Sequence, residues 1–435
     1  MNVSFVSLGC DKNRVNTEQM MALCLQAGIT IQEDCSGSDV VVINTCGFID
    51  SAKSEAIDTI LSAAQLKDAG EIQKILVTGC LSQRYQADIL EELPEIDGIM
   101  GTGCFGDIVP ALEQVMEGRE CRHFADINGP VEELPRVLST PRHYAYLRIA
   151  EGCSNRCAYC VIPSLRGKFR SRTKESILEE ARLLAASGVK ELIIVAQDIT
   201  RYGIDLYGKV CLTELLKELC KLDFRWVRLH YLYPELIDDE LIDEIASEDK
   251  IVKYLDIPIQ HINDTILRRM NRRGTGEEIR ALFKKLRERI PGLVLRTSLI
   301  TGLPGEGEAE FEELCDFLRE AKIERAGVFP YSPEEGTPAA LMPDRCSTEE
   351  AQRRAELCME IQAEIMDGFA ETFIGRELDV LVMGREPDGT PWGRSEYDSP
   401  DIDSRVIFSG DAAPGDMVRV RIDSVDDGEL IGEQI

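Results

Sequence analysis

Short apolar runs alternate with amphipathic segments along the first third of the chain. The runs have the length of buried β-strands, and the segments have the spacing of helices that cover a sheet. Strands are predicted at Ser4–Leu8, Val40–Ile43 and Lys74–Thr78, and helices at Thr17–Ala27 and Ser51–Ala64. This alternation predicts an α/β domain with a parallel sheet, because each helix returns the chain to the same end of the sheet.

The alternation resumes at Tyr144 and continues to Phe329. Predicted strands are Tyr144–Ala150, Glu191–Ala196, Trp226–Tyr231, Tyr254–Pro258, Val294–Ile300 and Ala326–Phe329. Predicted helices between them include Lys174–Ser187, Leu236–Ser247, Glu277–Ile290 and Glu308–Ala321. Six βα units predict an incomplete parallel barrel, whose reactive groups gather at the carboxyl ends of the strands.

The last part of the chain has a different pattern. A long helix is predicted from Ser347 to about Phe369, followed by short strands punctuated by Gly, Pro and Asp, which favours a small antiparallel β-barrel. These strands are Leu378–Met383, Arg405–Phe408 and Met417–Ile422. A segment with three prolines, 128–141, is predicted to be a linker. We therefore expect four parts in the 435 residues: 1–127, the linker 128–141, 142–368 and 369–435.

The composition of the chain indicates its cellular compartment and the class of partner that it binds. The chain shows no charged leader and no apolar run of membrane-spanning length, so we expect a cytoplasmic protein without a membrane anchor. An odd number of cysteines, 15, is a poor disulfide framework and favours metal sites and ordinary thiols. A net charge of −29 argues against direct RNA binding as the main activity and favours a basic partner.

A CxxxCxxC motif offers three thiolates within eight residues. The cysteines are Cys153, Cys157 and Cys160. Three cysteines can hold three irons of a four-iron cluster and leave the fourth iron open for a small molecule. The alternatives are a buried helical stripe of small residues and a zinc site. Glu151-Gly152 before the motif and Ser154-Asn155 within it indicate a loop, which favours the cluster.

Three further cysteines, Cys10, Cys46 and Cys80, each follow a predicted strand of the N-terminal domain. The separations of 36 and 34 residues match one βα unit each. Parallel strands end at the same edge of a sheet, so these cysteines can meet in space. The pattern predicts a second metal site, and the alternative is a coincidence of small buried residues.

The motifs resemble those of the radical S-adenosylmethionine methylthiotransferases over essentially the whole chain. They are Ser7-Leu-Gly-Cys10, Asn44-Thr-Cys46-Gly, Thr78-Gly-Cys80-Leu and Ile149-Ala-Glu-Gly-Cys153. Lys12-Asn13, Val195-Ala-Gln-Asp198 and the segment from Gly393 to Asp403 are similar to the branch that modifies a ribosomal protein. Asp11 and Asn16-Thr17 depart from that pattern without removing a ligand.

This resemblance implies an enzyme that inserts a methylthio group at the β-carbon of one aspartate in the twelfth protein of the small ribosomal subunit. It implies two 4Fe-4S clusters, one on Cys153, Cys157 and Cys160 that binds S-adenosylmethionine, and an auxiliary one on Cys10, Cys46 and Cys80. An electron donor such as flavodoxin or ferredoxin is implied, and the C-terminal barrel is expected to be a TRAM domain. No catalytic residue beyond the cluster ligands is assigned.

Two rival functions remain open: a tRNA adenosine methylthiotransferase, and an iron–sulfur scaffold or sensor without enzymatic activity. The C-terminal region 369–435 has 6 basic and 16 acidic residues, a net charge of −10. This charge favours docking of a basic ribosomal protein, free or within the small subunit, over binding of RNA.

Further residues at predicted strand ends are expected near S-adenosylmethionine. They are Tyr159, Gln197, Asp198, Gln260, Gly302 and Glu306, with His261 beside them. The structural alternatives are an exposed loop aromatic for Tyr159, a strand cap for Gln197 and Asp198, and a buried hydrogen-bonding role for Gln260 and His261. Gly302 is expected to let the backbone approach the cofactor. The basic series Arg166, Lys168, Arg170 and Arg172 either meets an anionic group or forms a solvated strand.

Overall fold

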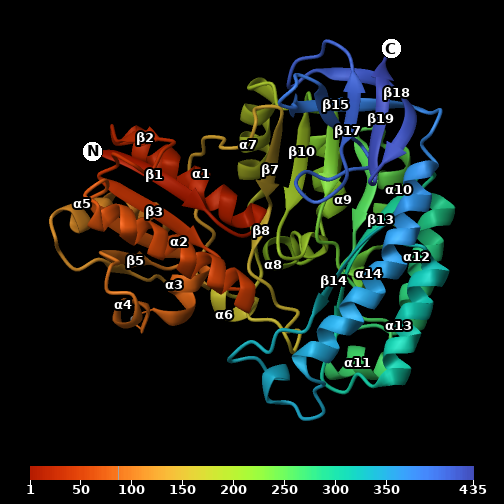
Figure 1. Cartoon of the computed structure of the whole chain (residues 1–435), viewed down its shortest axis with the longest axis horizontal. Coiled ribbons are helices and arrows are strands. Elements are labelled where there is room, and N and C mark those ends of the chain that lie inside the picture. The colour runs from red at the N-terminus through yellow and green to blue at the C-terminus, as the bar shows by residue number, and fades with distance from the viewer. Residues whose placement is uncertain (87) are drawn as a thin grey trace.

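The protein is described by a computed structural model that covers residues 1–86 and 88–435. Its strands form three large sheets and one two-stranded pair (Figure 1). The N-terminal sheet lies on the left of Figure 1, the central sheet in the middle and the C-terminal barrel at the upper right. The fold is α/β with a terminal β-barrel, as predicted.

The N-terminal sheet has six parallel strands in the order β2-β1-β3-β4-β5-β6. They are β1 (Asn2–Ser7), β2 (Thr30–Gln32), β3 (Val40–Thr45), β4 (Lys74–Gly79), β5 (Gly98–Met100) and β6 (Arg122–His123). The helices are α1 (Asp11–Gln26), α2 (Asp50–Asp68), α3 (Cys80–Tyr85), α4 (Asp88–Glu92) and α5 (Ile108–Met116). Strand side chains alternate between faces, so Val40 and Val42 pack with α1 and α5, whereas Val41 and Ile43 pack with α2.

The central sheet is an open, parallel, six-stranded partial barrel with the order β14-β13-β12-β11-β10-β7. Its strands are β7 (Tyr144–Arg148), β10 (Glu191–Val195), β11 (Trp226–Leu229), β12 (Ile251–Asp256), β13 (Val294–Thr301) and β14 (Arg325–Pro330). The main helices are α7 (Lys174–Ala186), α9 (Leu212–Leu219), α10 (Asp239–Ser247), α12 (Gly276–Arg289), α13 (Glu308–Ala321) and α14 (Thr348–Glu371). Shorter elements are β8 (Ala150–Glu151), β9 (Arg170–Ser171), α6 (Ile162–Arg166), α8 (Ile204–Tyr207) and α11 (Asp264–Arg269).

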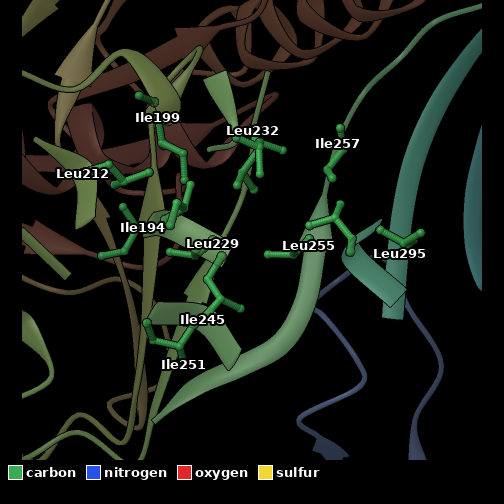
Figure 2. Packing of buried hydrophobic residues seen from close by; sticks show 14 of the residues in the cluster. Ile194, Ile199, Leu212, Leu229, Leu232, Ile245, Ile251, Leu255, Ile257 and Leu295 are labelled. Atoms are coloured by element: carbon green, nitrogen blue, oxygen red, sulfur yellow. The ribbon is translucent and has the colours of Figure 1, made fainter. Parts of the chain in front are cut away.

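The outer face of this sheet holds the largest apolar core. Leu229 and Leu255 from neighbouring strands pack there with Ile245 of α10 (Figure 2). The inner face is covered differently, because Val15 of α1 and Met383 of the C-terminal barrel pack against it. The N-terminal domain and the barrel therefore both reach the inner face of the central sheet.

The C-terminal strands close into a barrel in the order β15-β16-β17-β19-β18. They are β15 (Glu377–Arg385), β16 (Pro391–Ser395), β17 (Val406–Ser409), β18 (Met417–Asp426) and β19 (Glu429–Gln434). Four of the pairings are antiparallel, but β17 and β19 are parallel. The barrel is therefore mainly antiparallel, as expected. Its one parallel pairing arises because β18 and β19 form a hairpin, and β19 then lies beside β17 in the same direction.

The segment between the first two sheets contains no helix or strand from residue 124 to residue 143. It is nevertheless fixed in place, because Arg136 forms ion pairs with Glu18 of α1 at 2.6 Å and with Glu180 of α7 at 2.8 Å. Among the described residues, no helix has an apolar stretch of membrane-spanning length.

Candidate functional site

The CxxxCxxC loop joins β8 to α6, directly after the first strand of the central sheet. Its free thiols belong to Cys153, Cys157 and Cys160. The Cys153 amide donates a hydrogen bond to the Gly167 carbonyl at 3.0 Å, and the Ala158 amide donates to the Met270 carbonyl at 2.9 Å. Burial raises the pKa of Cys153 to about 11 and also raises the pKa of Cys160. The backbone thus fixes the loop, while the thiols of Cys153 and Cys160 remain protonated until a metal replaces the protons.

The N-terminal cysteines lie at the ends of three neighbouring parallel strands. Cys10 follows β1, Cys46 follows β3, and Cys80 follows β4 as the first residue of α3. A Cβ atom built on Gly9 would lie 3.1 Å from the Sγ of Cys46, and one on Gly47 would lie 3.0 Å from the backbone of Cys80. Burial raises the pKa of Cys46 to about 12, and Cys80 and Cys10 are close enough to add to that rise. The structure therefore brings these three cysteines together.

In the part of the chain that the structure describes, no three His, Cys, Asp or Glu side chains converge closely enough to hold a single metal ion. A four-iron cluster does not require such convergence, because each cysteine binds a separate iron.

The two cysteine sets approach each other at the domain boundary. Cys80 forms one buried apolar cluster with Val161 and Leu165, and Val161 directly follows Cys160. The segment after β11 also reaches both sets: the ring of Tyr231 lies 3.3 Å from the ammonium of Lys12, whereas the Tyr233 hydroxyl lies 3.7 Å from the Sγ of Cys157.

Tyr233 and Arg272 are site residues that the sequence did not reveal. The Arg272 guanidinium lies 3.8 Å from the Sγ of Cys157 and stacks 4.3 Å from the ring of Tyr233. Tyr233 carried a weak signal, because it lies just beyond a predicted strand end. Arg272 follows α11 with no recognisable motif, and only the fold places it beside the cysteines.

Gln197 and Asp198 lie at the end of β10 but have different environments. Gln197 donates to Glu151 Oε1 at 2.9 Å, and its own Oε1 is buried without a hydrogen-bond partner among the described residues. Both carboxylate oxygens of Asp198 accept protein hydrogen bonds, including one from Asn155 Nδ2 at 2.8 Å and one from the Thr200 amide at 3.1 Å. Asp198 thus anchors the cysteine loop, and Gln197 keeps an acceptor free.

The residues after β12 and β13 are fixed mainly by contacts with other parts of the protein. Gln260 has a φ of +71°, an unusual backbone conformation for a residue with a side chain. Gly302 has a φ of +76°, and a Cβ there would overlap the Cβ of Ala351 in α14. This glycine therefore permits helix packing. Glu306 accepts from the Gly302 amide at 2.8 Å and pairs with His261 Nε2 at 3.2 Å.

Tyr159 belongs to a mostly apolar cluster beside the cysteine loop, with Ala158, Met270 and Leu303. Its pKa is raised well above the usual value, chiefly by burial. The ring is therefore packed between the cysteine loop and the end of β13, and the exposed-aromatic alternative is not favoured.

The basic series is not a solvated strand. Lys168 is exposed, but Arg166 and Arg172 are buried. Arg172 pairs with Glu180 of α7 at 2.6 Å, whereas Arg166 donates to Asn16 Oδ1 of α1 at 2.8 Å. Arg166 therefore links the cysteine loop to the N-terminal domain.

Three family models match successive parts of the chain. Residues 2–101 match the Uncharacterized protein family UPF0004, residues 147–318 match the Radical SAM superfamily, and residues 374–435 match the TRAM domain. A parallel partial barrel with CxxxCxxC at its rim, joined to a second cysteine-bearing sheet and a TRAM barrel, defines a radical S-adenosylmethionine enzyme of the methylthiotransferase class.

Curated relatives cover almost the whole chain. Ribosomal protein uS12 methylthiotransferase RimO of Caldanaerobacter subterraneus subsp. tengcongensis is 47% identical over 436 residues, 99% of each chain. The protein of the same name from Pelotomaculum thermopropionicum is 48% identical over 442 residues, 100% of this chain and 99% of the relative. The chain therefore belongs to the RimO methylthiotransferase family.

Solved structures agree at the level of the fold. The radical S-adenosylmethionine methyltransferase TsrM from Kitasatospora setae superimposes with a TM-score of 0.55 at 16% identity, covering 75% of this chain and 72% of TsrM. The cobalamin-dependent enzyme OxsB superimposes with a TM-score of 0.51 at 12% identity, covering 82% of this chain and 56% of OxsB.

Membership of the radical S-adenosylmethionine superfamily implies S-adenosylmethionine and an iron–sulfur cluster, and the residues present fit both. Three free thiols in a fixed loop would provide ligands for a cluster with an open iron. The unpartnered Gln197 Oε1 is an acceptor at the strand end, which suits the ammonium of a methionine moiety.

Proposed function

We propose that the protein inserts a methylthio group at the β-carbon of a specific aspartate in the twelfth protein of the small ribosomal subunit, uS12. The observation that carries this proposal is the similarity of the entire chain to uS12 methylthiotransferases, at 44–48% identity in eight relatives. These relatives do not favour the tRNA-modifying alternative.

We also propose two four-iron clusters in one shared cavity. Cys153, Cys157 and Cys160 would hold the cluster that binds S-adenosylmethionine, and Cys10, Cys46 and Cys80 would hold an auxiliary cluster. When bound, the two clusters and S-adenosylmethionine supply the radical and the sulfur that are needed to modify an unactivated carbon. The packing of Cys80 on Val161 supports this arrangement, because it brings the two cysteine sets to one domain boundary.

The surrounding side chains would orient these groups and exclude water. Gln197 would accept a hydrogen bond from the methionine ammonium, and Tyr159 would pack near the adenine. Arg272 and Tyr233 would donate towards Cys157, which stabilises an anionic thiolate. Asp198, Gly302 and Glu306 would act indirectly, by fixing the strand ends that carry these side chains.

The C-terminal barrel would dock a basic protein. Most of its arginines are already paired: Arg385 with Asp411, Arg405 with Glu386 and Glu429, Arg419 with Glu377 and Asp379, Arg421 with Asp423 and Glu433, and Arg394 with Glu191. These guanidinium groups are therefore not free to neutralise phosphates. Contact of this barrel with RNA would therefore be secondary.

A flavodoxin or ferredoxin would deliver the electrons to the enzyme.

The substrate is tested by incubating purified, cluster-loaded protein with uS12 and, separately, with unmodified tRNA. Mass spectrometry should show a methylthio group on one aspartate of uS12 and no change in the tRNA. Modification of tRNA alone would overturn the substrate assignment. Failure to form 5′-deoxyadenosine from S-adenosylmethionine in a fully loaded, reduced protein would instead favour an iron–sulfur scaffold.

Two clusters predict about eight iron atoms per chain. Replacement of Cys10, Cys46 and Cys80 by alanine should lower this number to about four. An unchanged iron content in that variant would discard the auxiliary cluster.

A further inference from the structure

Arg166 is a buried cation that extends from the cysteine loop into the N-terminal domain. It ends α6, six residues after Cys160, and is only 2% exposed. Its Nη1 donates to Asn16 Oδ1 at 2.8 Å, and its Nη2 donates to Asn13 Oδ1. In the sequence, Arg166 is close to Cys153, Cys157 and Cys160. In the structure, its guanidinium lies against α1, the helix that follows Cys10.

The guanidinium also lies close to the N-terminal cysteine set, which consists of Cys10, Cys46 and Cys80. Asn13 Oδ1, which it contacts, lies 4.0 Å from the Sγ of Cys80, and the preceding residue Leu165 packs on Cys80. The positive charge of Arg166 therefore lies beside the N-terminal cysteines.

Among the described residues, Arg166 has no carboxylate that it does not share. Glu151 Oε2 lies 3.4 Å from Arg166 Nη1 but only 2.8 Å from Arg148 Nη1, so two guanidinium groups share one carboxylate. The other side-chain partners, Asn13 and Asn16, are neutral. A buried cation with an incomplete counter-charge is unfavourable. Thiolates carrying a cluster would provide the missing negative charge.

We propose that Arg166 is a positioning residue of the auxiliary cluster, which holds the cluster from the Cys80 side and raises its reduction potential. This inference rests on the two-cluster proposal. A fixed positive charge stabilises the more negative, reduced form of a nearby cluster. Arginine suits this role because it stays protonated, so its charge does not change with the cluster.

The test isolates the auxiliary cluster in the full-length chain. Cys153, Cys157 and Cys160 are replaced by alanine in a parent variant, and Arg166→Gln is added to it. The reduction potential is measured by a redox titration monitored by electron paramagnetic resonance, together with iron and sulfide content. Arg166→Gln should shift the potential to a more negative value, and Arg166→Lys, which keeps the charge, should shift it less.

Arg148→Gln is the matched control. Arg148 is also buried and pairs with the same carboxylate, but it has no contact with a thiol among the described residues. We expect a smaller shift for this variant. An equal shift in both variants, or an unshifted potential at full iron content in Arg166→Gln, would overturn the role of Arg166.

Loss of the cluster is also informative. If Arg166→Gln alone loses iron and Arg166→Lys retains it, the positioning role is supported. Equal loss in Arg166→Gln and Arg148→Gln would point to general destabilisation and overturn the role. A parent variant that binds no iron would overturn the two-cluster proposal together with this inference, so the two failures are distinguishable.

Discussion

Gln197 has an acceptor atom that the described protein leaves unused. Its Nε2 is held by Glu151, and this contact aims the unpartnered Oε1 away from that carboxylate. We expect Gln197→Met to weaken binding of S-adenosylmethionine roughly ten- to hundred-fold, because one hydrogen bond to a charged group contributes about 1.5–3 kcal/mol. Calorimetric titration of the cluster-loaded protein measures the effect.

Gln362 of α14 provides a control for this substitution. It is fully buried and donates to the Ile323 carbonyl at 2.9 Å, away from both cysteine sets. Gln362→Met should lower thermal stability and leave the affinity of the folded protein for S-adenosylmethionine unchanged. Equal affinities in the wild type and Gln197→Met would remove Gln197 from the binding site.

The buried thiols make cluster assembly dependent on pH. Burial raises the pKa of Cys153 to about 11 and that of Cys46 to about 12, so both are protonated in the metal-free protein at neutral pH. Iron binds the thiolate, so each thiol must release its proton on assembly. Iron uptake should therefore be faster at about pH 9 than at about pH 7, on the way to these pKa values.

The measurement is the initial rate of iron incorporation during anaerobic reconstitution, with proton release followed in weakly buffered solution. A variant with serine at all six cysteine positions should show neither iron uptake nor its pH dependence. A rate that is independent of pH in the wild type would contradict the prediction.

Residue type alone indicated part of the chemistry. Thiols at strand ends are distinctive, so the amino-acid sequence was enough to propose both cysteine sets. The roles of Gly302 and Glu306 could not be inferred in this way, because they depend on Ala351 and His261, which come from other elements. Arg166 stood out as part of a basic series, but its contacts with α1 follow only from the docking of two domains.

At the level of secondary structure elements, the close approach of α14 to the end of β13 explains the glycine at position 302 without invoking the cofactor. Gly302 and Gly292 have nearly the same φ, +76° and +74°, but only Gly302 has a neighbour at the Cβ position. Alanine at either position incurs the cost of a left-handed backbone, about 1–2 kcal/mol. Gly302→Ala must also displace α14, so we expect it to lose about 1–3 kcal/mol more.

Urea unfolding of the two metal-free variants measures the difference directly. Because the backbone penalty is common to both, the excess in Gly302→Ala reports the contact with Ala351. Equal stabilities for the two variants would mean that α14 moves aside freely.

Element prediction succeeded where apolar periodicity was strong and failed where other contacts fix the strand. The strands of both parallel sheets that carry the cysteines were expected within a few residues. β16 was missed because Pro391 and Gly393 argue against a strand. Its glycine is required by close packing, since a Cβ there would overlap the Leu381 carbonyl oxygen. The start of β12 was also missed, by three residues at Ile251.

At the scale of the whole molecule, a buried ion-pair network joins the central sheet to the C-terminal barrel. Glu191 of β10 pairs with Arg228 of β11 at 2.7 Å and with Arg394 of β16 at 2.5 Å, and all three side chains are buried. Glu191→Gln would leave two guanidinium groups without a carboxylate. We expect a loss of about 3–5 kcal/mol in the free energy of unfolding, measured in urea at neutral pH.

The pH dependence of this effect has a defined sign. Burial raises the pKa of Glu191, but Arg394 and Arg228 outweigh it, so the pKa in the folded protein lies below the ordinary value of 4.5. The stabilisation is therefore complete above that value and is lost as pH falls through the folded pKa. The gap between wild type and Glu191→Gln should narrow in acid. The exposed pair Asp316–Arg319 is the control, and Asp316→Asn should have a much smaller effect.

Ion pairs within the protein also determine which acidic side chains of the C-terminal region remain available to a binding partner. Asp398 and Asp403, counted in the acidity of the C-terminal region, are buried against Arg325 at 2.8 Å and 3.7 Å and cannot attract a basic protein. Asp388, Asp426 and Asp427 are among the exposed acids of this region that have no ion-pair partner among the described residues, so they contribute to the attraction. Their simultaneous replacement by asparagine should slow association with uS12 several-fold at low salt.

High salt should abolish the difference, because exposed charges are screened beyond a Debye length of about 8–10 Å. Stopped-flow association with uS12 over a range of ionic strength measures both effects. Replacement of Glu55, Asp58 and Asp68, three exposed acids on α2, by their amides is the matched control and should change the rate less. If the barrel variant associates as fast as the wild type at low salt, the acidic barrel is not the docking surface, and the basic substrate must approach from another side of the molecule.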